Sequence, residues 1–266
     1  MRRILMNLPV PRHLPRQKGL YRDSLNPAAL DAVKIVALLS MLVDHTNTLF
    51  LAKPEPLLYA LGRMAFPLFT LIWAMNVFNN PARLQQRANR LWGWTCLTQP
   101  AFTLAFHHQM PWYALNILFV FASVTQLFAL HYRFGSRGIF FGGIILAVLV
   151  IPLTPGSYGL PGLLLAASLV LMFSPVAAGW RRAGAVAAIL ALFCLNGMTH
   201  LISSPVETLL FATVPTLVFP AVVVMLARDH VPDNIQRFMP RHFFYFAYAG
   251  HLLLAGMLLL WMPVRA

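Results

Sequence analysis

Apolar stretches of membrane-spanning length make up most of this chain and limit the folds open to it. A helix of about 20 apolar residues crosses roughly 30 Å of hydrocarbon. Nine candidate spans occur, separated by short breaks that are polar or rich in proline and glycine: 28–52, 57–78, 91–106, 112–130, 138–153, 158–180, 183–202, 207–227 and 243–261. Hydrophobic residues form 59% of the sequence, charged residues form only 10%, and the mean hydropathy is +0.69, values far from those of a soluble domain. We therefore predict an all-α fold, a polytopic membrane bundle of about nine transmembrane helices.

The net charge of +13 is unevenly distributed along the chain. Cytoplasmic loops of membrane proteins carry an excess of lysine and arginine. With the N-terminus inside, the inner segments hold nearly every arginine, and the outer segments hold only Lys53 and Arg265. We therefore expect the N-terminus inside and the C-terminus outside, and we attribute the positive charge to topology rather than to nucleic-acid binding. The third and fifth spans are short, at about 16 residues each, and merging one with a neighbour would reverse the C-terminus.

The first residues form a separate basic segment. Residues 1–27 carry six lysines and arginines, and their apolar run, Ile4 to Val10, is too short for a signal peptide. We expect residues 1–27 to form a basic cytoplasmic tail and residues 28–266 to form the transmembrane helical domain.

The two cysteines indicate neither a metal site nor a disulfide. Cys96 and Cys194 both lie inside apolar spans, and neither belongs to a C-x-x-C motif. Zinc sites and disulfide frameworks need several cysteines or histidines at characteristic spacings. We therefore expect no metal.

The first span contains four ionisable residues, Asp31, Lys34, Asp44 and His45. A charge near the centre of a spanning helix costs about 2.5 to 3.5 kcal/mol on insertion scales, so such a residue is a candidate site residue. At 100° per residue, Lys34 and His45 lie on one face of the helix, with Asp31 beside them and Asp44 turned roughly 80° away. This polar stripe predicts a protein interior or a water-filled cavity beside the first span, because lipid would not tolerate it.

Asp44 and Arg63 are expected to pair. Both lie roughly 10 Å below the outer surface, on neighbouring spans that run in opposite directions. Pairing would offset much of the cost of burying either charge. The pair is either part of a catalytic site or a clasp between two helices with no catalytic role.

His45 is the candidate general base, since its unperturbed pKa of about 6.5 suits proton transfer near neutral pH. Adjacent residues on a helix do not face each other, so Asp44 is a doubtful partner and one must come from another span. His251 lies roughly midway along the last span. It either closes the cavity against the first helix or hydrogen-bonds a carbonyl, and His45 itself is either a base or a packed core residue.

Three arginines are candidates for phosphate binding. Arg83, Arg87 and Arg90 are spaced i, i+4 and i+7, so an inner extension of the third helix would align them on one face. Guanidinium groups bind phosphate bidentately. The alternative is a topology signal or contact with lipid headgroups.

Several of these residues lie in motifs that resemble the TraX family of conjugative-pilus acetylation proteins, most closely over residues 28–130. The motifs are Leu30-Asp31-Ala32-Val33-Lys34, Met41-Leu42-Val43-Asp44-His45, Gly62-Arg63-Met64-Ala65-Phe66-Pro67-Leu68-Phe69 and Arg90-Leu91. Residues 157–162 resemble the family's Tyr-Gly element and residues 244–252 its aromatic C-terminal helix, although Tyr248-Ala249-Gly250 stands where a Tyr-Pro pair is expected. A fainter similarity links Arg87-Ala88-Asn89-Arg90 to the Arg-x-x-Arg motif of the acyltransferase 3 family.

The resemblance implies a multi-pass enzyme of the bacterial inner membrane. It would use acetyl-CoA as co-substrate to acetylate the N-terminal amine of pilin, with pilin and membrane lipids as its partners. On this hypothesis the residues fall into three groups: His45, Asp44 and Arg63 are catalytic, Arg87, Arg90 and Lys34 bind coenzyme A, and Asp31, Tyr248 and His251 contact substrate.

The predicted site raises one geometric question. Acetyl-CoA is cytoplasmic, whereas His45 lies nearer the outer surface, so either a deep cavity or an acetyl relay is required. The rival hypothesis is a pilus-assembly or small-solute transport protein without chemistry, in which the polar stripe is a pathway and the arginines contact lipid.

Reporter fusions test the predicted topology. Lysine and arginine favour the cytoplasmic side of the membrane. Fusions placed after Arg90, Arg137, Arg182 and Arg237 should therefore report a cytoplasmic location. Fusions placed near Lys53, Gly156 and Ser204 should report a periplasmic location. A periplasmic signal at Arg90 would separate the arginines from acetyl-CoA and contradict the hypothesis.

Overall fold

The computed structural model describes residues 25–78, 80–196, 202–240 and 242–262, and every regular element in these ranges is helical. In order, the elements are α1 (Pro27–Phe50), α2 (Pro56–Gly62), α3 (Ala65–Val77), η1 (Pro81–Arg83), α4 (Leu84–Phe106), α5 (Leu118–Phe134), α6 (Ser136–Leu153), α7 (Gly159–Phe173), α8 (Ala178–Cys194), α10 (Pro205–Thr208), η2 (Leu209–Thr213), α11 (Val214–His230) and α12 (Phe243–Trp261). The all-α prediction is confirmed. Most of the predicted basic tail, and Arg265, lie outside the described residues.

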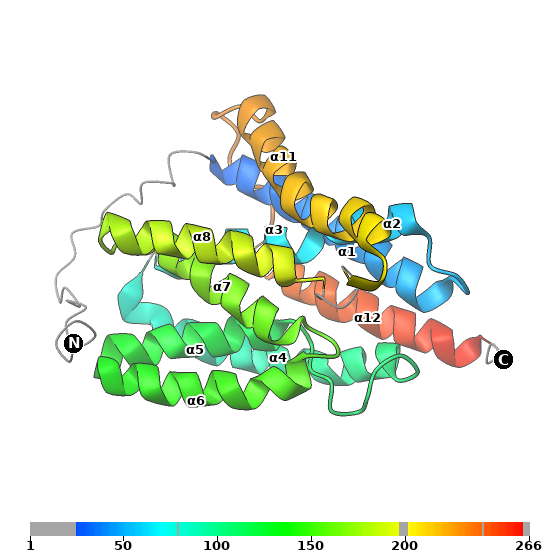
Figure 1. Cartoon of the computed structure of the whole chain (residues 1–266), viewed down its shortest axis with the longest axis horizontal. Helices are drawn as coiled ribbons and strands as arrows, with labels where there is room; N and C mark the ends of the chain where they lie inside the picture. Colours follow the sequence, from blue (N-terminus) through cyan, green and yellow to red (C-terminus); the bar gives the residue numbers. More distant parts are fainter. Residues whose placement is uncertain (1–24, 79, 197–201, 241, 263–266) are drawn as a thin grey trace.

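The helices pack as neighbours in layers (Figure 1). α5 lies between α4 and α6, α7 packs on α8, and α12 packs along α4. α1 contacts α2, α3 and α11, so the first helix, with its polar stripe, lies inside the bundle rather than at its edge. Asp31 and Asn47 of α1 have no exposed surface.

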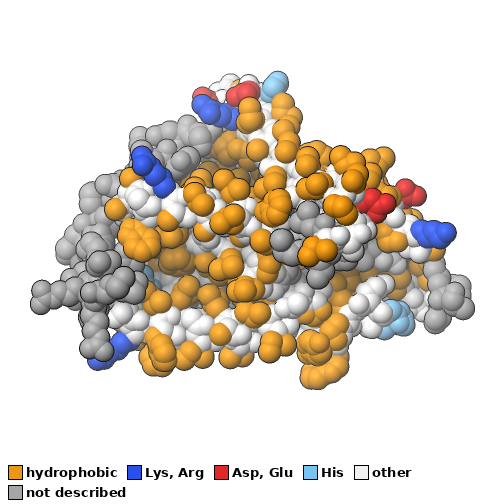
Figure 2. All heavy atoms as spheres, in the orientation of Figure 1, with side chains coloured by type: hydrophobic (Ala, Val, Ile, Leu, Met, Phe, Trp, Pro, Cys, Tyr) orange, Lys and Arg blue, Asp and Glu red, His pale blue; other side chains and the backbone are white. Residues whose placement is uncertain are grey.

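The face of the bundle in view in Figure 2 is largely apolar. Large hydrophobic side chains such as Phe140, Ile151 and Met225 are more than half exposed, which suits contact with lipid. Four helical segments are long and apolar enough to cross a membrane: Pro56–Val77, Ser136–Leu153, Pro205–His230 and Phe243–Trp261. The chain is a helical membrane protein, whereas the count of nine spans and the N-inside orientation stay predictions.

The second predicted span, 57–78, is not one continuous helix. α2 ends at Gly62 and α3 begins at Ala65. Pro67 explains the break, because proline has no N–H to donate to the carbonyl of Arg63 and its ring would clash with that carbonyl. The break places Arg63 at the junction of two short helices.

Other boundaries also differ from the prediction. The third helix begins at Leu84 rather than residue 91, so it includes Arg87 and Arg90, and the fourth begins at Leu118 rather than residue 112. The sixth ends at Phe173 rather than residue 180, because the residue before Pro175 cannot easily stay helical. The eighth runs continuously through 205–230 but contains the π-helical turn η2.

Candidate functional site

A large cavity among the described residues joins the two groups of polar residues that the sequence singles out. Its volume is about 1190 Å³, and both Lys34 and His45 line it. These two residues are separated by about 16 Å along α1, at 1.5 Å per residue. The arginines at one end are Arg83, Arg87, Arg90 and Arg237, and the residues at the other end are Asp44, His45, Arg63 and Tyr158. The cavity therefore extends along the bundle from a basic end to the predicted catalytic residues.

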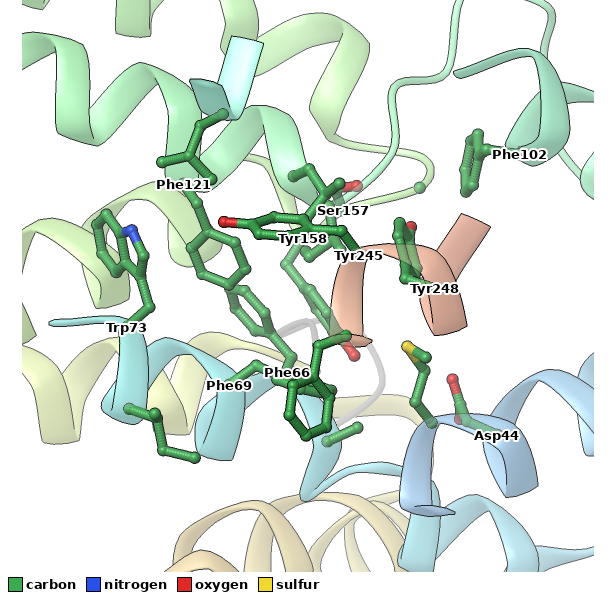
Figure 3. Close-up of a pocket in the computed structure, with 18 of the residues that line it drawn as sticks. Asp44, Phe66, Phe69, Trp73, Phe102, Phe121, Ser157, Tyr158, Tyr245 and Tyr248 are labelled. Atoms are coloured by element: carbon green, nitrogen blue, oxygen red, sulfur yellow. The ribbon is translucent and has the colours of Figure 1, made fainter. Parts of the chain in front are cut away.

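Between these two ends the wall of the cavity is largely aromatic (Figure 3). Phe66 stacks on Tyr158 with ring centroids 4.8 Å apart, and Trp73 lies 5.0 Å from Phe121. Tyr245 and Tyr248 of α12 line the same space. The cavity thus offers flat apolar surfaces with hydroxyl groups, together with charged groups towards its ends.

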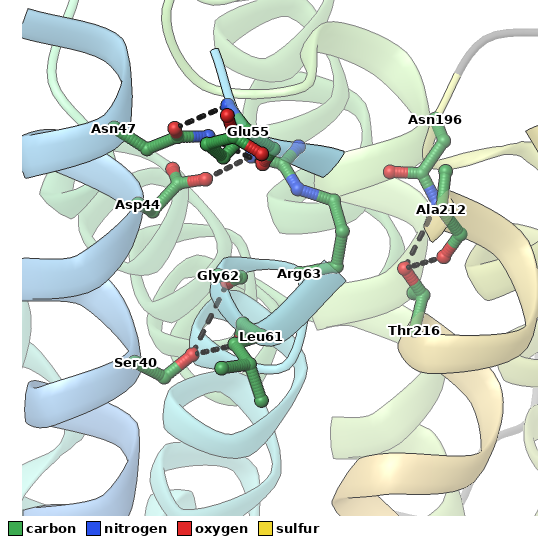
Figure 4. Close-up of polar contacts among 10 residues, drawn as sticks. All are labelled: Ser40, Asp44, Asn47, Glu55, Leu61, Gly62, Arg63, Asn196, Ala212 and Thr216. Atoms are coloured by element: carbon green, nitrogen blue, oxygen red, sulfur yellow. Dashed lines mark hydrogen bonds and ion pairs between the residues drawn. The ribbon is translucent and has the colours of Figure 1, made fainter. Parts of the chain in front are cut away.

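Asp44 and Arg63 form the predicted ion pair (Figure 4). Arg63 Nη2 donates to Asp44 Oδ1 across 2.6 Å, and the two side chains are only 12% and 18% exposed. The Tyr59 ring lies 4.2 Å from Arg63 Cζ, close enough for a cation–π interaction. The buried Nε of Arg63 has no hydrogen-bond acceptor among the described residues. The pair is therefore tightly held, and the Nε–H of the guanidinium stays available as a donor.

Contacts between side chains of α1 and the backbone in and just before α2 set the position of this pair. A Cβ atom added at Gly62 would lie 2.4 Å from Asp44 Oδ1, so only glycine lets α2 approach the carboxylate this closely. Ser40 Oγ donates to the Leu61 carbonyl across 2.5 Å, and Asn47 hydrogen-bonds both the N–H and the carbonyl of Glu55. These contacts clamp the α1–α2 hairpin around the ion pair.

His45 has its partner on the last helix. Its Nδ1 lies 2.7 Å from Nε2 of His251, and the two rings are nearly coplanar, with an interplanar angle of 20° and centroids 5.0 Å apart. His251 Nδ1 lies 2.9 Å from the Ala247 carbonyl. His251 therefore hydrogen-bonds a carbonyl, as one of the two predicted arrangements has it, and it also contacts the first helix. Tyr248 lines the cavity one turn earlier on α12, whereas His251 is not among the cavity-lining residues.

Asp31 belongs to a structural contact at the basic end. Its Oδ1 accepts from Lys34 Nζ across 2.7 Å and lies 3.7 Å from Arg237 Nε, and its Oδ2 accepts from the Met239 N–H across 3.2 Å. Asp31 is fully buried and does not line the cavity. It therefore joins α1 to the segment before α12, and Lys34 rather than Asp31 faces the cavity.

The predicted phosphate-binding arginines differ in their surroundings. Arg87 Nη1 donates to the carbonyls of Asn76 and Val77, the latter across 2.7 Å, and so caps the end of α3. Arg90 lines the cavity, and its buried Nε has no acceptor in the part of the chain that the structure describes. Arg83 lines the same end and is exposed.

Two further residues that line the cavity, Arg237 and Tyr158, are not among the predicted site residues. Arg237 is predicted only as a topology signal, but it lines the cavity and its Nε lies 3.7 Å from Asp31 Oδ1. No role is predicted for Tyr158 from the sequence. Its backbone has a φ of 63°, a conformation that is unusual for a residue other than glycine and costs of order 1 to 3 kcal/mol. Its ring lies 5.8 Å from Arg63 Cζ. The Tyr158-Gly159 pair after a Pro-Gly turn was the available signal.

Comparison with known proteins identifies the family. The family model described as TraX protein matches residues 29–259. This chain belongs to the TraX family. The Protein TraX of Escherichia coli is 36% identical to it over 236 residues, which cover 88% of this chain and 89% of that protein, and the Protein TraX of Escherichia coli strain K12 is 32% identical with the same coverage. No solved structure matches this chain. The TraX match spans every site residue from Asp31 to His251, so the resemblance read from the motifs is confirmed.

The fit of Gly62 against Asp44 can be tested with two glycine substitutions. Gly62→Ala should destabilise the protein by about 1 to 3 kcal/mol, because the new methyl group overlaps the carboxylate. Gly93→Ala is the matched control, since nothing lies within 4 Å of a Cβ there. It should be neutral or slightly stabilising, because alanine is the better helix former. Thermal unfolding in detergent measures both, and equal midpoints for the two variants would contradict the close approach.

Proposed function

We propose that this protein is a membrane acetyltransferase that moves the acetyl group of acetyl-CoA to the N-terminal amine of a conjugative pilin subunit. The observation that carries this proposal is the cavity that connects the basic residues to His45 and the Asp44–Arg63 pair. Membership of the TraX family supports the choice of substrate.

Coenzyme A would enter at the basic end. Arg90, Lys34 and Arg237 line the cavity there and would hold its phosphates, with Arg83 nearer the surface. Arg87 of the Arg-x-x-Arg motif would act by fixing the end of α3 beside them. Typical ligand pockets measure about 300 to 1,000 Å³. The cavity of about 1190 Å³ therefore has room for the long thioester arm.

This arrangement would let a cytoplasmic donor reach a site nearer the outer surface. The thioester arm would lie along the aromatic part of the cavity and present its carbonyl to His45 and Arg63. No acetylated relay residue is then needed. The pilin amine would meet the thioester at that end, and Tyr248 would help to place it.

The chemistry follows from these residues. The α-amino group has an ordinary pKa of about 7.7 to 8.0, so a useful fraction is neutral near physiological pH. Its nitrogen attacks the thioester carbonyl, and His45 accepts a proton as the C–N bond forms. Arg63, held by Asp44, stabilises the negative oxygen of the tetrahedral intermediate. The C–S bond then breaks, and His45 returns the proton to the sulfur, which gives the amide and free coenzyme A.

The rival function is a pilus-assembly or small-solute transport protein that performs no chemistry. Such a protein would use the same cavity as a passage, so the volume of the cavity does not distinguish the transport function from the acetyltransferase function. An acetyl-transfer assay distinguishes the two functions. The purified protein in detergent is given labelled acetyl-CoA and a peptide with the pilin N-terminus, and transfer of the label to the peptide is measured.

His45 is the residue on which the chemistry depends most directly. His45→Ala and His45→Gln should insert normally yet lower the acetyl-transfer rate by about 10²- to 10⁴-fold, because neither side chain accepts a proton near neutral pH. Mass spectrometry of pilin from cells and the amount of each variant in the membrane give the readout. Full acetylation by a well-expressed His45→Ala protein would remove His45 from the mechanism and favour the rival function.

Arg90 tests cofactor binding separately from chemistry. Arg90→Ala should raise KM for acetyl-CoA about tenfold or more with little change in kcat, because phosphate contacts are equal in the ground and transition states. Arg133→Ala is the matched control, since Arg133 is an exposed arginine that does not line the cavity. An unchanged KM in Arg90→Ala would favour lipid contact as the role of this arginine.

A further inference from the structure

The contact between His45 and His251 fixes more than the position of two rings. A carbonyl oxygen can only accept a hydrogen bond, so the 2.9 Å approach of His251 Nδ1 to the Ala247 carbonyl requires the hydrogen to be on Nδ1. A neutral imidazole carries one N–H and one acceptor nitrogen. Nε2 of His251 is then an acceptor.

The protonation of His45 follows from that of His251. His45 Nδ1 lies 2.7 Å from this acceptor nitrogen, so His45 must donate, and its hydrogen is on Nδ1. Nε2 of His45 is left with its lone pair. The opposite assignment would bring the lone pairs of His251 Nδ1 and the Ala247 oxygen together at hydrogen-bond distance.

We propose that His251 is a positioning residue that holds His45 in the tautomer whose Nε2 accepts the amine proton. This inference rests on the proposed function, and it replaces the substrate-contact role that the sequence suggested for His251. The chain of donors runs from His45 Nδ1 to His251 Nε2, and from His251 Nδ1 to the backbone of α12. A backbone carbonyl one helical turn away therefore determines which nitrogen of His45 is the base.

The surroundings of His45 support this role. The His251 ring meets the His45 ring edge to edge, with the two ring planes only 20° apart, and Phe106 packs against His45 in a T-shaped arrangement with centroids 5.3 Å apart, so ring rotation is restricted. Asp44, the nearest carboxylate along the chain, is engaged by Arg63. When His45 takes the amine proton at Nε2, its Nδ1–H still donates to His251, which stays neutral throughout the reaction.

Two amide substitutions at position 251 separate positioning from a structural role. His251→Gln places an amide oxygen where Nε2 stood and can still accept from His45, whereas His251→Asn reaches only the position of Nδ1. We expect kcat of His251→Asn to fall about 10- to 100-fold with KM for acetyl-CoA unchanged, and His251→Gln to recover most of the loss. Equal kcat values for two equally stable amide variants would overturn the proposal.

The tautomer itself gives a readout that does not depend on activity. In protein labelled with ¹⁵N-histidine and reconstituted in lipid, nitrogen NMR should find the hydrogen of neutral His45 on Nδ1 in the wild type and in His251→Gln. In His251→Asn the Nε2–H form should appear, because the acceptor is gone. A wild-type His45 that carries its hydrogen on Nε2 would overturn the inference, even if acetyl transfer is found. Absence of acetyl transfer with the expected tautomer would instead defeat the proposed function and leave the histidine arrangement standing.

Discussion

The cost of placing charge in a low-dielectric interior governs the arrangement of this protein. Each ionisable side chain of α1 has a partner: Asp31 binds Lys34, Asp44 binds Arg63, and His45 contacts His251. An unpaired charge at these depths would be expensive, and each partner offsets part of that cost. Two other regions of the bundle, the α2–α3 junction and α12, thus supply partners to α1, while Asp31 and Lys34 pair within α1 itself. The cavity lies where they meet.

The break between α2 and α3 is the local feature that makes the central pair possible. Pro67 has no N–H to donate to the carbonyl of Arg63, so the helix is interrupted there. Gly62 has no side chain, which lets α2 approach α1 closely. The guanidinium therefore lies at a helix junction, between the carboxylate of Asp44 and the ring of Tyr59. Tyr158, with its left-handed backbone, brings a second ring to the same place.

The site combines rigid aromatic walls with charged ends, and this combination suits a long donor with a charged head and a neutral reactive end. Phosphate groups would stay at Arg90 and Lys34, while the thioester would lie among aromatic rings. Water exclusion there would strengthen the electrostatic contribution of Arg63 to the transition state. On the proposed function, the same geometry explains the contact with His251, because a base in a confined space has to present its lone pair in one direction.

The sequence alone determined the helical membrane fold, the Asp44–Arg63 pair and the need for a partner to His45 from another span. These follow from local rules: apolar length, the cost of buried charge and the facing of residues on a helix. The motifs also determined the TraX family, which the family model and the relatives confirm. The positive-inside orientation and the roles of the site residues stay predictions.

Only the tertiary structure decided that Arg87 caps α3, that Asp31 lies outside the cavity, that Arg237 and Tyr158 line it, and that His251 is the partner of His45. The physical reason is that these outcomes depend on which faces of distant helices meet, and helical periodicity within one segment carries no information about the segment packed against it.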